Sequence, residues 1–270
     1  MLAWERELHM LLNGKIAVIY GAAGGIGSAV ARAFAGAGAN VVLAGHTVEP
    51  LAALAEEIHA AGGKAETAHL DALDPVAVAR HADGVVERLG RIDVSFNLIG
   101  IPHRQGRRFV DLTVGDFADP IRGYAMTHFL TATAAARHMI EQRSGVILML
   151  TTQPARLAVP HSGPFGAALG MIEAFARNLA AEVGPSGVRV ACILSTGSPD
   201  VPDVRDAIRR HAEASGKTAD ALEAEYAQQA VLKRMTLTRD VADVATFLAS
   251  DRASAITATT VNASCGLIAG

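Results

Sequence analysis

Hydrophobic and polar positions follow two different periods along the chain. Short aliphatic or β-branched runs, typical of strands buried on both faces, alternate with longer stretches in which apolar residues recur every three or four positions. The short runs predict strands at 15–20, 40–45, 64–70, 92–99, 145–151, 187–194 and 258–262, and the longer stretches predict helices at 26–37, 49–61, 75–89, 114–141, 165–183 and 239–249. We therefore predict an α/β fold: a doubly wound parallel sheet of about seven strands, with right-handed crossovers and helices on both faces.

The segment 198–234 is more charged and more helix-prone than its surroundings. We predict that it forms a small helical insertion over the carboxyl edge of the sheet, which is the edge where a doubly wound fold binds its ligand. No linker, repeat or low-complexity stretch divides the sequence, so we expect one domain over residues 1–270.

Composition narrows the class of protein. The chain has 270 residues, 50% hydrophobic and 19% charged, which excludes a disordered chain and a charged coiled coil. The net charge is −3 and the basic residues are spread along the sequence, which argues against a nucleic-acid partner. The two cysteines, Cys192 and Cys265, fit neither a disulfide framework nor a metal-ligand spacing, so we expect no metal. No apolar run reaches the ~18 residues of a membrane span, and residues 1–7 carry acids where a secretory signal carries bases. We expect a cytoplasmic protein without a membrane partner.

A glycine-rich turn at 21–27 joins the first predicted strand to the first predicted helix. Residues without side chains let backbone N–H groups and a helix N-terminus approach a pyrophosphate closely. The alternative is a tight turn that never meets a ligand. The candidate phosphate-binding residues are Gly21, Ala23, Gly25, Ile26 and Gly27.

From about residue 14 onward the chain resembles the short-chain dehydrogenase/reductase family. Gly21 with Gly25-Ile26-Gly27 is similar to the family's TGxxxGIG turn, with Tyr20 in place of Thr, and 97–100 is similar to its NNAG segment. The segments 240–242 and 247–251 resemble its EDVA…FLASD tail. The resemblance implies a Rossmann-type fold, NADP or NAD as cofactor, a small-molecule substrate, and a homo-oligomer that is a tetramer or a dimer. It also implies an adenine site at Asp71 and Ala72 and a ribose site at Asn97 and Gly100.

The family's catalytic Ser, Tyr, Lys and Asn have no counterparts at the matching positions. Aligned on the strand at 145–151, Thr152 takes the place of Ser, Phe165 of Tyr and Leu169 of Lys, while Tyr124 takes the place of Asn. Hydride addition to a ketone leaves an alkoxide that needs a tuned acid, so the resemblance implies an atypical active site.

Three side chains remain as catalytic candidates: Thr152, Tyr124 and His161. Thr152 keeps a hydroxyl, and His161 lies in a loop expected to roof the substrate pocket. The Tyr124 phenol either points into the space vacated by Lys, as a hydrogen-bond donor, or fills the core. His128, four residues on, either accepts from that phenol or faces solvent or a neighbouring subunit; we favour the second arrangement.

Two loops bear on the cofactor. The second strand ends at Gly45-His46-Thr47, with no acid at 45 to hold ribose hydroxyls, so His46 and Thr47 weakly favour NADP over NAD unless His46 is simply solvated. Ser195-Thr196-Gly197 replaces the family's Pro-Gly, which predicts a looser loop beside the nicotinamide.

Three functions remain open. The first is an NAD(P)(H)-dependent oxidoreductase whose proton donor has been replaced. The second is a non-redox enzyme such as a cyclase, isomerase or dehydratase, and the third is a non-catalytic nucleotide-binding protein. The basic segment 103–108 either recognises an anionic substrate or is a solvated loop, and we favour the solvated loop.

Overall fold

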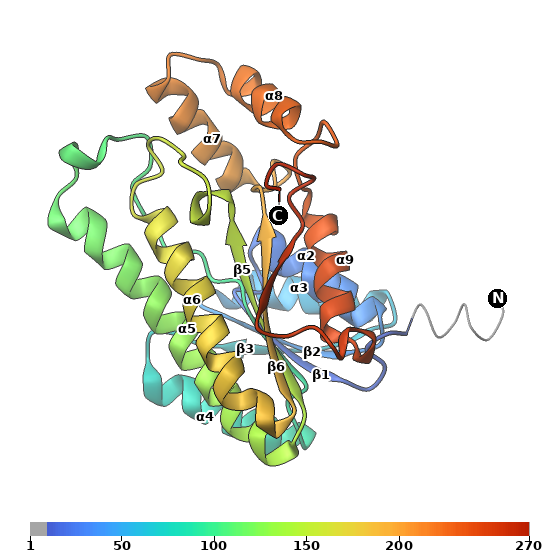
Figure 1. The fold of residues 1–270 in the computed structure, drawn as a ribbon. Coiled ribbons are helices and arrows are strands. Elements are labelled where there is room, and N and C mark those ends of the chain that lie inside the picture. Colours follow the sequence, from blue (N-terminus) through green and yellow to red (C-terminus); the bar gives the residue numbers. More distant parts are fainter. Residues whose placement is uncertain (1–9, 270) are drawn as a thin grey trace.

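The computed structural model describes residues 10–269, so residues 1–7 of the expected non-secretory start lie outside the described residues. Seven parallel strands form one sheet in the order β3-β2-β1-β4-β5-β6-β7 (Figure 1). The strands are β1 (Ile16–Tyr20), β2 (Asn40–Gly45), β3 (Lys64–His69), β4 (Val94–Asn97), β5 (Gly145–Thr152), β6 (Val188–Ser195) and β7 (Thr259–Asn262). The predicted doubly wound parallel sheet is confirmed.

β4 is shorter than the predicted strand 92–99 because backbone N–H groups at both ends of that range donate to side chains and not to a neighbouring strand. The Ile92 N–H donates to Gln142 Oε1 at 3.0 Å, and the Ile99 N–H donates to Asn97 Oδ1 at 3.0 Å. The second bond turns the chain out of the sheet just where the candidate ribose site begins.

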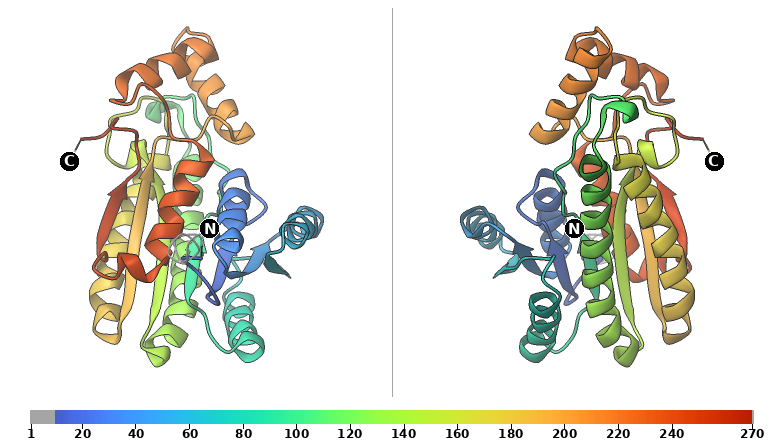
Figure 2. Two further views of the ribbon diagram at one scale, coloured as in Figure 1. Left: turned by 90° about the vertical axis from the view of Figure 1, so that its right-hand side faces the viewer. Right: turned by 90° about the vertical axis from the view of Figure 1, so that its left-hand side faces the viewer.

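Helices cover both faces of the sheet (Figure 2). One face carries α4 (Pro75–Leu89), α5 (Val114–Gln142) and α6 (Phe165–Val183), and the other carries α2 (Gly25–Gly36), α3 (Val48–Ala60) and α9 (Thr238–Ala249). Val18 and Tyr20 of β1 point into the first layer, whereas Ala17 and Ile19 point into the second. Because both faces are buried, the strand reads as a continuous apolar run.

Local sequence fixes where the helices begin. Asp74 caps α4 by accepting the N–H groups of Val76 and Ala77, and Pro75 occupies the first turn, where no N–H is needed. Thr113 and Asp116 form a reciprocal capping box at the start of α5.

The segment 198–234 forms α7 (Pro202–Ala214) and α8 (Ala219–Gln229), which lie beyond the carboxyl ends of β5 and β6 (Figure 1). These helices share a small apolar cluster of Ile208, Ala212, Leu222 and Met235. Across residues 10–269, no helix combines the length and the apolar character that a membrane crossing requires.

Candidate cofactor and substrate site

Glycine is required at two positions of the turn between β1 and α2. Gly21 has φ +74°, and a Cβ there would lie 2.8 Å from the Leu98 carbonyl oxygen. A Cβ on Gly27 would lie 2.2 Å from the Gly21 carbonyl oxygen. The turn therefore brings β1, α2 and the exit of β4 closer together than any side chain permits.

The N-terminus of α2 is open. No side chain caps its first turn, and Ala23 and Gly25 are exposed, so the first N–H groups have no intramolecular side-chain acceptor. Free N–H groups at the positive end of a helix dipole form an anion-binding site.

The strand register brings the other predicted cofactor residues to the same edge. Tyr20 is paired with Ala44 of β2 and with Asn97 of β4, so the loops that follow these strands begin side by side. Asn97 donates to Thr131 Oγ1 at 3.0 Å and accepts the Ile99 N–H, so its side chain shapes the β4 exit next to the exposed Gly100.

His46 and Asp71 meet at the far end of this edge. His46 Nε2 lies 3.5 Å from Asp71 Oδ1, which also accepts the Leu73 N–H at 2.9 Å, and both side chains are largely exposed. Thr47 is exposed, whereas Ala72 is buried. A carboxylate this close to His46 opposes a 2′-phosphate, so the geometry adds no support to a preference for NADP.

A cavity of about 840 Å³ extends from this edge to the underside of α7. Its wall includes Ile26 and Asn97 on the cofactor side, and Tyr124, Thr152, Phe165 and Leu169 deeper in. Thr152 ends β5 and Phe165 begins α6, so the fold brings into one space the four residues that the sequence analysis aligned with the family's catalytic set.

His103 covers the ring of Phe165, a contact that sequence reasoning missed. The two rings stack with centroids 4.6 Å apart and planes at 21°, and the Tyr124 ring lies 5.8 Å from Phe165. His103 Nδ1 lies 2.7 Å from the Ile101 carbonyl oxygen, and because a carbonyl can only accept, Nδ1 carries the proton. His103 Nε2 then accepts a hydrogen bond from the Gln105 amide nitrogen, 2.5 Å away. Burial lowers the pKa of His103, the Ile101 bond opposes that change, and Arg210 lowers it further. The one sequence signal for a role of His103 is its position three residues after Gly100, in the loop that follows β4.

Tyr124 and His128 are buried side by side on α5. Burial raises the pKa of the Tyr124 phenol, partly offset by the backbone of Ile101. His128 was expected to face solvent or another subunit, and that is wrong: it is 3% exposed, its Nδ1 donates to the Tyr124 carbonyl at 2.9 Å, and its Nε2 is buried without a partner among the described residues. This bond, made along the helix rather than to the phenol, turns the ring toward the cavity.

His161 is not brought together with Thr152 and Tyr124. It does not line the cavity; Val159 of the same loop does. Its backbone has φ +64°, and its carbonyl accepts the Gly106 N–H at 2.9 Å.

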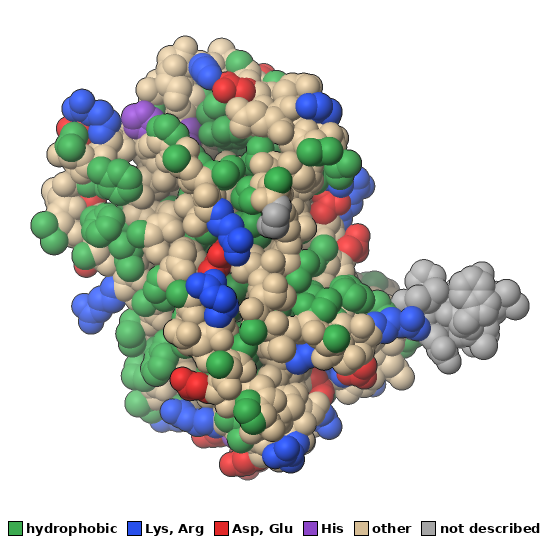
Figure 3. Space-filling model, in the orientation of Figure 1, with side chains coloured by type: hydrophobic (Ala, Val, Ile, Leu, Met, Phe, Trp, Pro, Cys, Tyr) green, Lys and Arg blue, Asp and Glu red, His purple; other side chains and the backbone are tan. Residues whose placement is uncertain are grey.

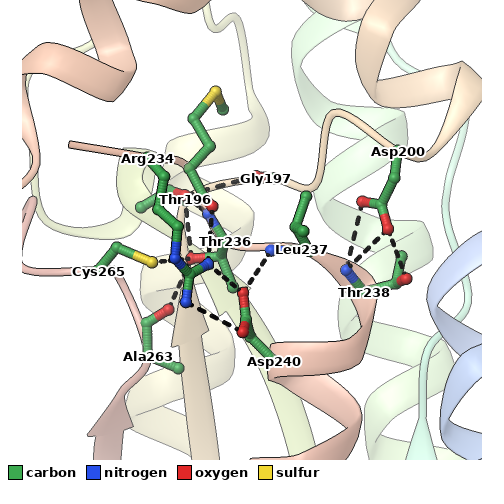
Figure 4. A network of polar contacts seen from close by, with 11 residues as sticks. Thr196, Gly197, Asp200, Arg234, Thr236, Leu237, Thr238, Asp240, Ala263 and Cys265 are labelled. Carbon is green, nitrogen blue, oxygen red and sulfur yellow. Dashed lines mark hydrogen bonds and ion pairs between the residues drawn. The ribbon is translucent and has the colours of Figure 1, made fainter. Parts of the chain in front are cut away.

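The loop after β6 is tied down, contrary to the looser loop predicted for Ser195-Thr196-Gly197 (Figure 4). Thr196 Oγ1 accepts the Thr236 N–H at 3.0 Å and donates to Thr236 Oγ1 at 3.1 Å. Asp200, farther along, accepts both the N–H and the hydroxyl of Thr238, at 3.1 and 2.6 Å. Hydrogen bonds from distant residues thus replace the missing proline ring.

A buried carboxylate also anchors the segment after Thr152. Glu173 of α6 accepts from Thr151 Oγ1 at 3.0 Å and from Arg156 Nη2 at 2.9 Å. The pair joins the end of β5 to the loop that follows, so Arg156 and Glu173 position the wall of the cavity without lining it.

A parallel sheet of this order, with a glycine turn into its first helix and a cavity at its carboxyl edge, defines the class of Rossmann-type α/β proteins. Comparison with known proteins then identifies the family. A family model described as Enoyl-(Acyl carrier protein) reductase matches residues 21–268. The chain belongs to the short-chain dehydrogenase/reductase family, as the resemblance implied.

Relatives match over nearly the whole chain. The chain is 34% identical to "Tropinone reductase-like 2" of Erythroxylum coca over 253 residues, covering 91% of this chain and 87% of the relative. It is 30% identical to "D-threitol dehydrogenase" of Mycolicibacterium smegmatis over 250 residues, covering 93% and 91%. The solved structure of levodione reductase superimposes with a TM-score of 0.86 at 26% identity, covering 94% of this chain and 98% of that one.

Buried His128 should make stability depend on pH. Burial lowers its pKa from 6.5 to about 4, despite its bond to Tyr124, so between these values the unfolded chain binds a proton that the native state does not. The free energy of unfolding should therefore be highest above pH 6.5 and fall on acidification, by about 1.4 kcal/mol per pH unit for one group. Urea unfolding of wild type and His128→Gln between pH 5 and 6.5 measures the slope. The slope of unfolding free energy against pH should be smaller in the variant by roughly the contribution of one histidine. An unchanged slope would contradict the lowered pKa of His128.

Proposed function

We propose that the protein is an oxidoreductase-family enzyme of the cytoplasm that binds NAD(H) or NADP(H) across the glycine turn. The observation that carries this proposal is the turn itself, in which Gly21 and Gly27 leave no room for a Cβ and the uncapped start of α2 is exposed. Gly21, Ala23, Gly25, Ile26 and Gly27 would hold the pyrophosphate, Asp71 and Ala72 the adenine, and Asn97 and Gly100 the ribose. When bound, a nicotinamide supplies or accepts a hydride.

For the second phosphate of NADP, the proposal gives only a weak preference. His46 and Thr47 offer donors at the end of β2, but Asp71 lies 3.5 Å from His46. A carboxylate at this place disfavours a phosphate.

The proposed active site lacks the usual proton donor. Phe165 has no ionisable proton, and Leu169 has no charge to tune one. Thr152 would orient a substrate oxygen, and Tyr124 adds a hydroxyl, but burial raises the pKa of that phenol and makes it a poorer acid. The cavity has the size of a small-molecule site. His161 takes no part in this proposal, because it lies outside the cavity wall.

The same wall favours one alternative, a non-redox enzyme such as a cyclase, isomerase or dehydratase on this scaffold. Stacked aromatic rings at the Tyr position shape a pocket without supplying an acid, which suits substrate folding as well as slow hydride transfer. A dinucleotide bound without turnover of any ketone favours this alternative.

The protein is also proposed to be a homo-oligomer, a tetramer or a dimer. α5 exposes Phe117, Met126, Phe129 and Ile140, and hydrophobic side chains gather on the left side of the molecule over α5 (Figure 3). The ring centroids of Phe129 on α5 and Phe175 on α6 lie 6.2 Å apart, so the exposed apolar surface is continuous across the two helices.

Gly25→Val should abolish dinucleotide binding, because a Cβ there would lie 2.7 Å from Val201 Cγ2 and the branched side chain would crowd the N-terminus of α2. Gly36→Val at the end of the same helix is the matched control, since a Cβ there meets nothing within 4 Å. Calorimetric titration with NADH and NADPH measures both variants, and melting temperatures exclude loss of fold. Unchanged affinity in Gly25→Val, or no binding by wild type at millimolar dinucleotide, refutes the cofactor site.

Simple ketones and quinones should be reduced slowly or not at all, because a positioned general acid contributes about 10² to 10⁴ in rate. The double variant Phe165→Tyr, Leu169→Lys should raise turnover with reduced nicotinamide. Phe175→Tyr, on the outer side of the same helix, should not. Wild-type turnover near the ~10 s⁻¹ of ordinary enzymes would show that another group supplies the proton.

Phe129→Glu should shift the oligomer toward smaller species, because it places a charge on an apolar surface where Phe129 is 52% exposed. Val48→Glu, at the start of α3 on the opposite face, should leave the size unchanged. Light scattering at micromolar concentration decides, and a monomeric wild type refutes the oligomer.

A further inference from the structure

Arg210 of α7 reaches the outer end of the cavity. Gly106 follows β4 with φ +83°, and a Cβ on it would lie 3.1 Å from the Arg210 carbonyl oxygen and 3.4 Å from its Cβ. This close approach fixes the position of Arg210 over the loop that carries His103. Both residues line the cavity.

The charge of Arg210 has no counterpart within the described chain. Across residues 10–269, Arg210 takes part in no ion pair, although it is only partly exposed. The neighbouring charges are already used: Arg104 pairs with Asp116 at 2.6 Å, and Asp206 pairs with Arg209 at 3.2 Å. Asp203, the other carboxylate of the cavity wall, lies two helical turns away along α7, about 10 Å in rise.

Histidines around Arg210 add unused polar atoms. Burial lowers the pKa of His211, and His161, Arg210 and His103 lower it further, so these groups share one electropositive environment. His211 Nε2, in the cavity wall, is buried without a partner among the described residues. Figure 3 shows histidine beside basic side chains at the upper left of the molecule. An arginine without a counter-ion and the unsatisfied Nε2 of His211 cost free energy that an anionic ligand would recover.

We infer that the outer end of the cavity binds an anionic group of the substrate, a carboxylate or a phosphate ester, through Arg210, with Arg107 and His211 beside it. A guanidinium presents two parallel N–H donors, which match the paired oxygens of either anion. The inference rests on the proposed function in that it assigns a substrate class to the same cavity. It takes the anion-recognition alternative for the 103–108 segment, in which Gly106 packs against Arg210 while Arg104 and Arg107 stay exposed.

The test is thermal unfolding of the full chain at pH 7.5 with inorganic phosphate or succinate, at ionic strength held constant with chloride. Wild type and Arg205→Gln should show a saturable rise in midpoint with at least one of the two anions. Arg205 is the matched control, since it lies on the same helix, is exposed and does not line the cavity. Arg210→Gln should weaken the apparent affinity about tenfold or more, and Arg210→Lys should retain part of it.

A response to phosphate alone assigns a phosphate ester, and a response to succinate alone assigns a carboxylate. No saturable rise in wild type with either anion, or equal rises in wild type and Arg210→Gln, overturns the inference. Calorimetric titration of Arg210→Gln with NADH separates this result from the proposed function, because this variant should lose the anion response and keep dinucleotide binding at the glycine turn. Arg210→Lys guards against the case in which Arg210→Gln fails to fold.

Discussion

The backbone of Gly27 lies against the carbonyl of Gly21, and the backbone of Gly21 lies against the exit of β4. Because Gly21 and Gly27 have no side chains, β1, α2 and the exit of β4 can approach one another this closely. Because these strands are parallel and in register, their carboxyl ends meet at one edge, and the open N-terminus of α2 faces that edge. Every part of the candidate site is positioned relative to this turn.

Hydrogen bonds and stacked rings hold the wall of the cavity beyond the turn. Thr152, Phe165 and Leu169 occupy one space, and His103 stacks on the ring at 165. Hydrogen bonds from Thr236 and Thr238 hold the loop after β6, and Glu173 with Arg156 holds the loop after β5. A frame held by this many specific bonds supports the proposed binding site, and in that proposal the side chains inside it would not supply the usual acid.

The fold was predictable because strand and helix periods differ and the central strands, such as β1 and β4, are buried on both faces. The cofactor residues were predictable for a related reason: they follow strand ends directly, so sequence order places them in space. The contacts between distant segments were not. The stacking of His103 on Phe165 joins residues that are 62 positions apart in the sequence. Hydrophobic periodicity carries no information about such distant pairs. The wrong orientation predicted for His128 arose similarly, since its bond to the Tyr124 carbonyl depends on its rotamer.

A crystal structure of the protein grown with NADPH tests the central claim most directly. The account predicts a pyrophosphate within hydrogen-bond distance of the backbone N–H groups in 21–27. It also predicts a nicotinamide at the cavity near Thr196, with Phe165 and Leu169 facing it and no ionisable group at either position. A dinucleotide bound elsewhere on the molecule, or none bound at millimolar concentration, would contradict the account.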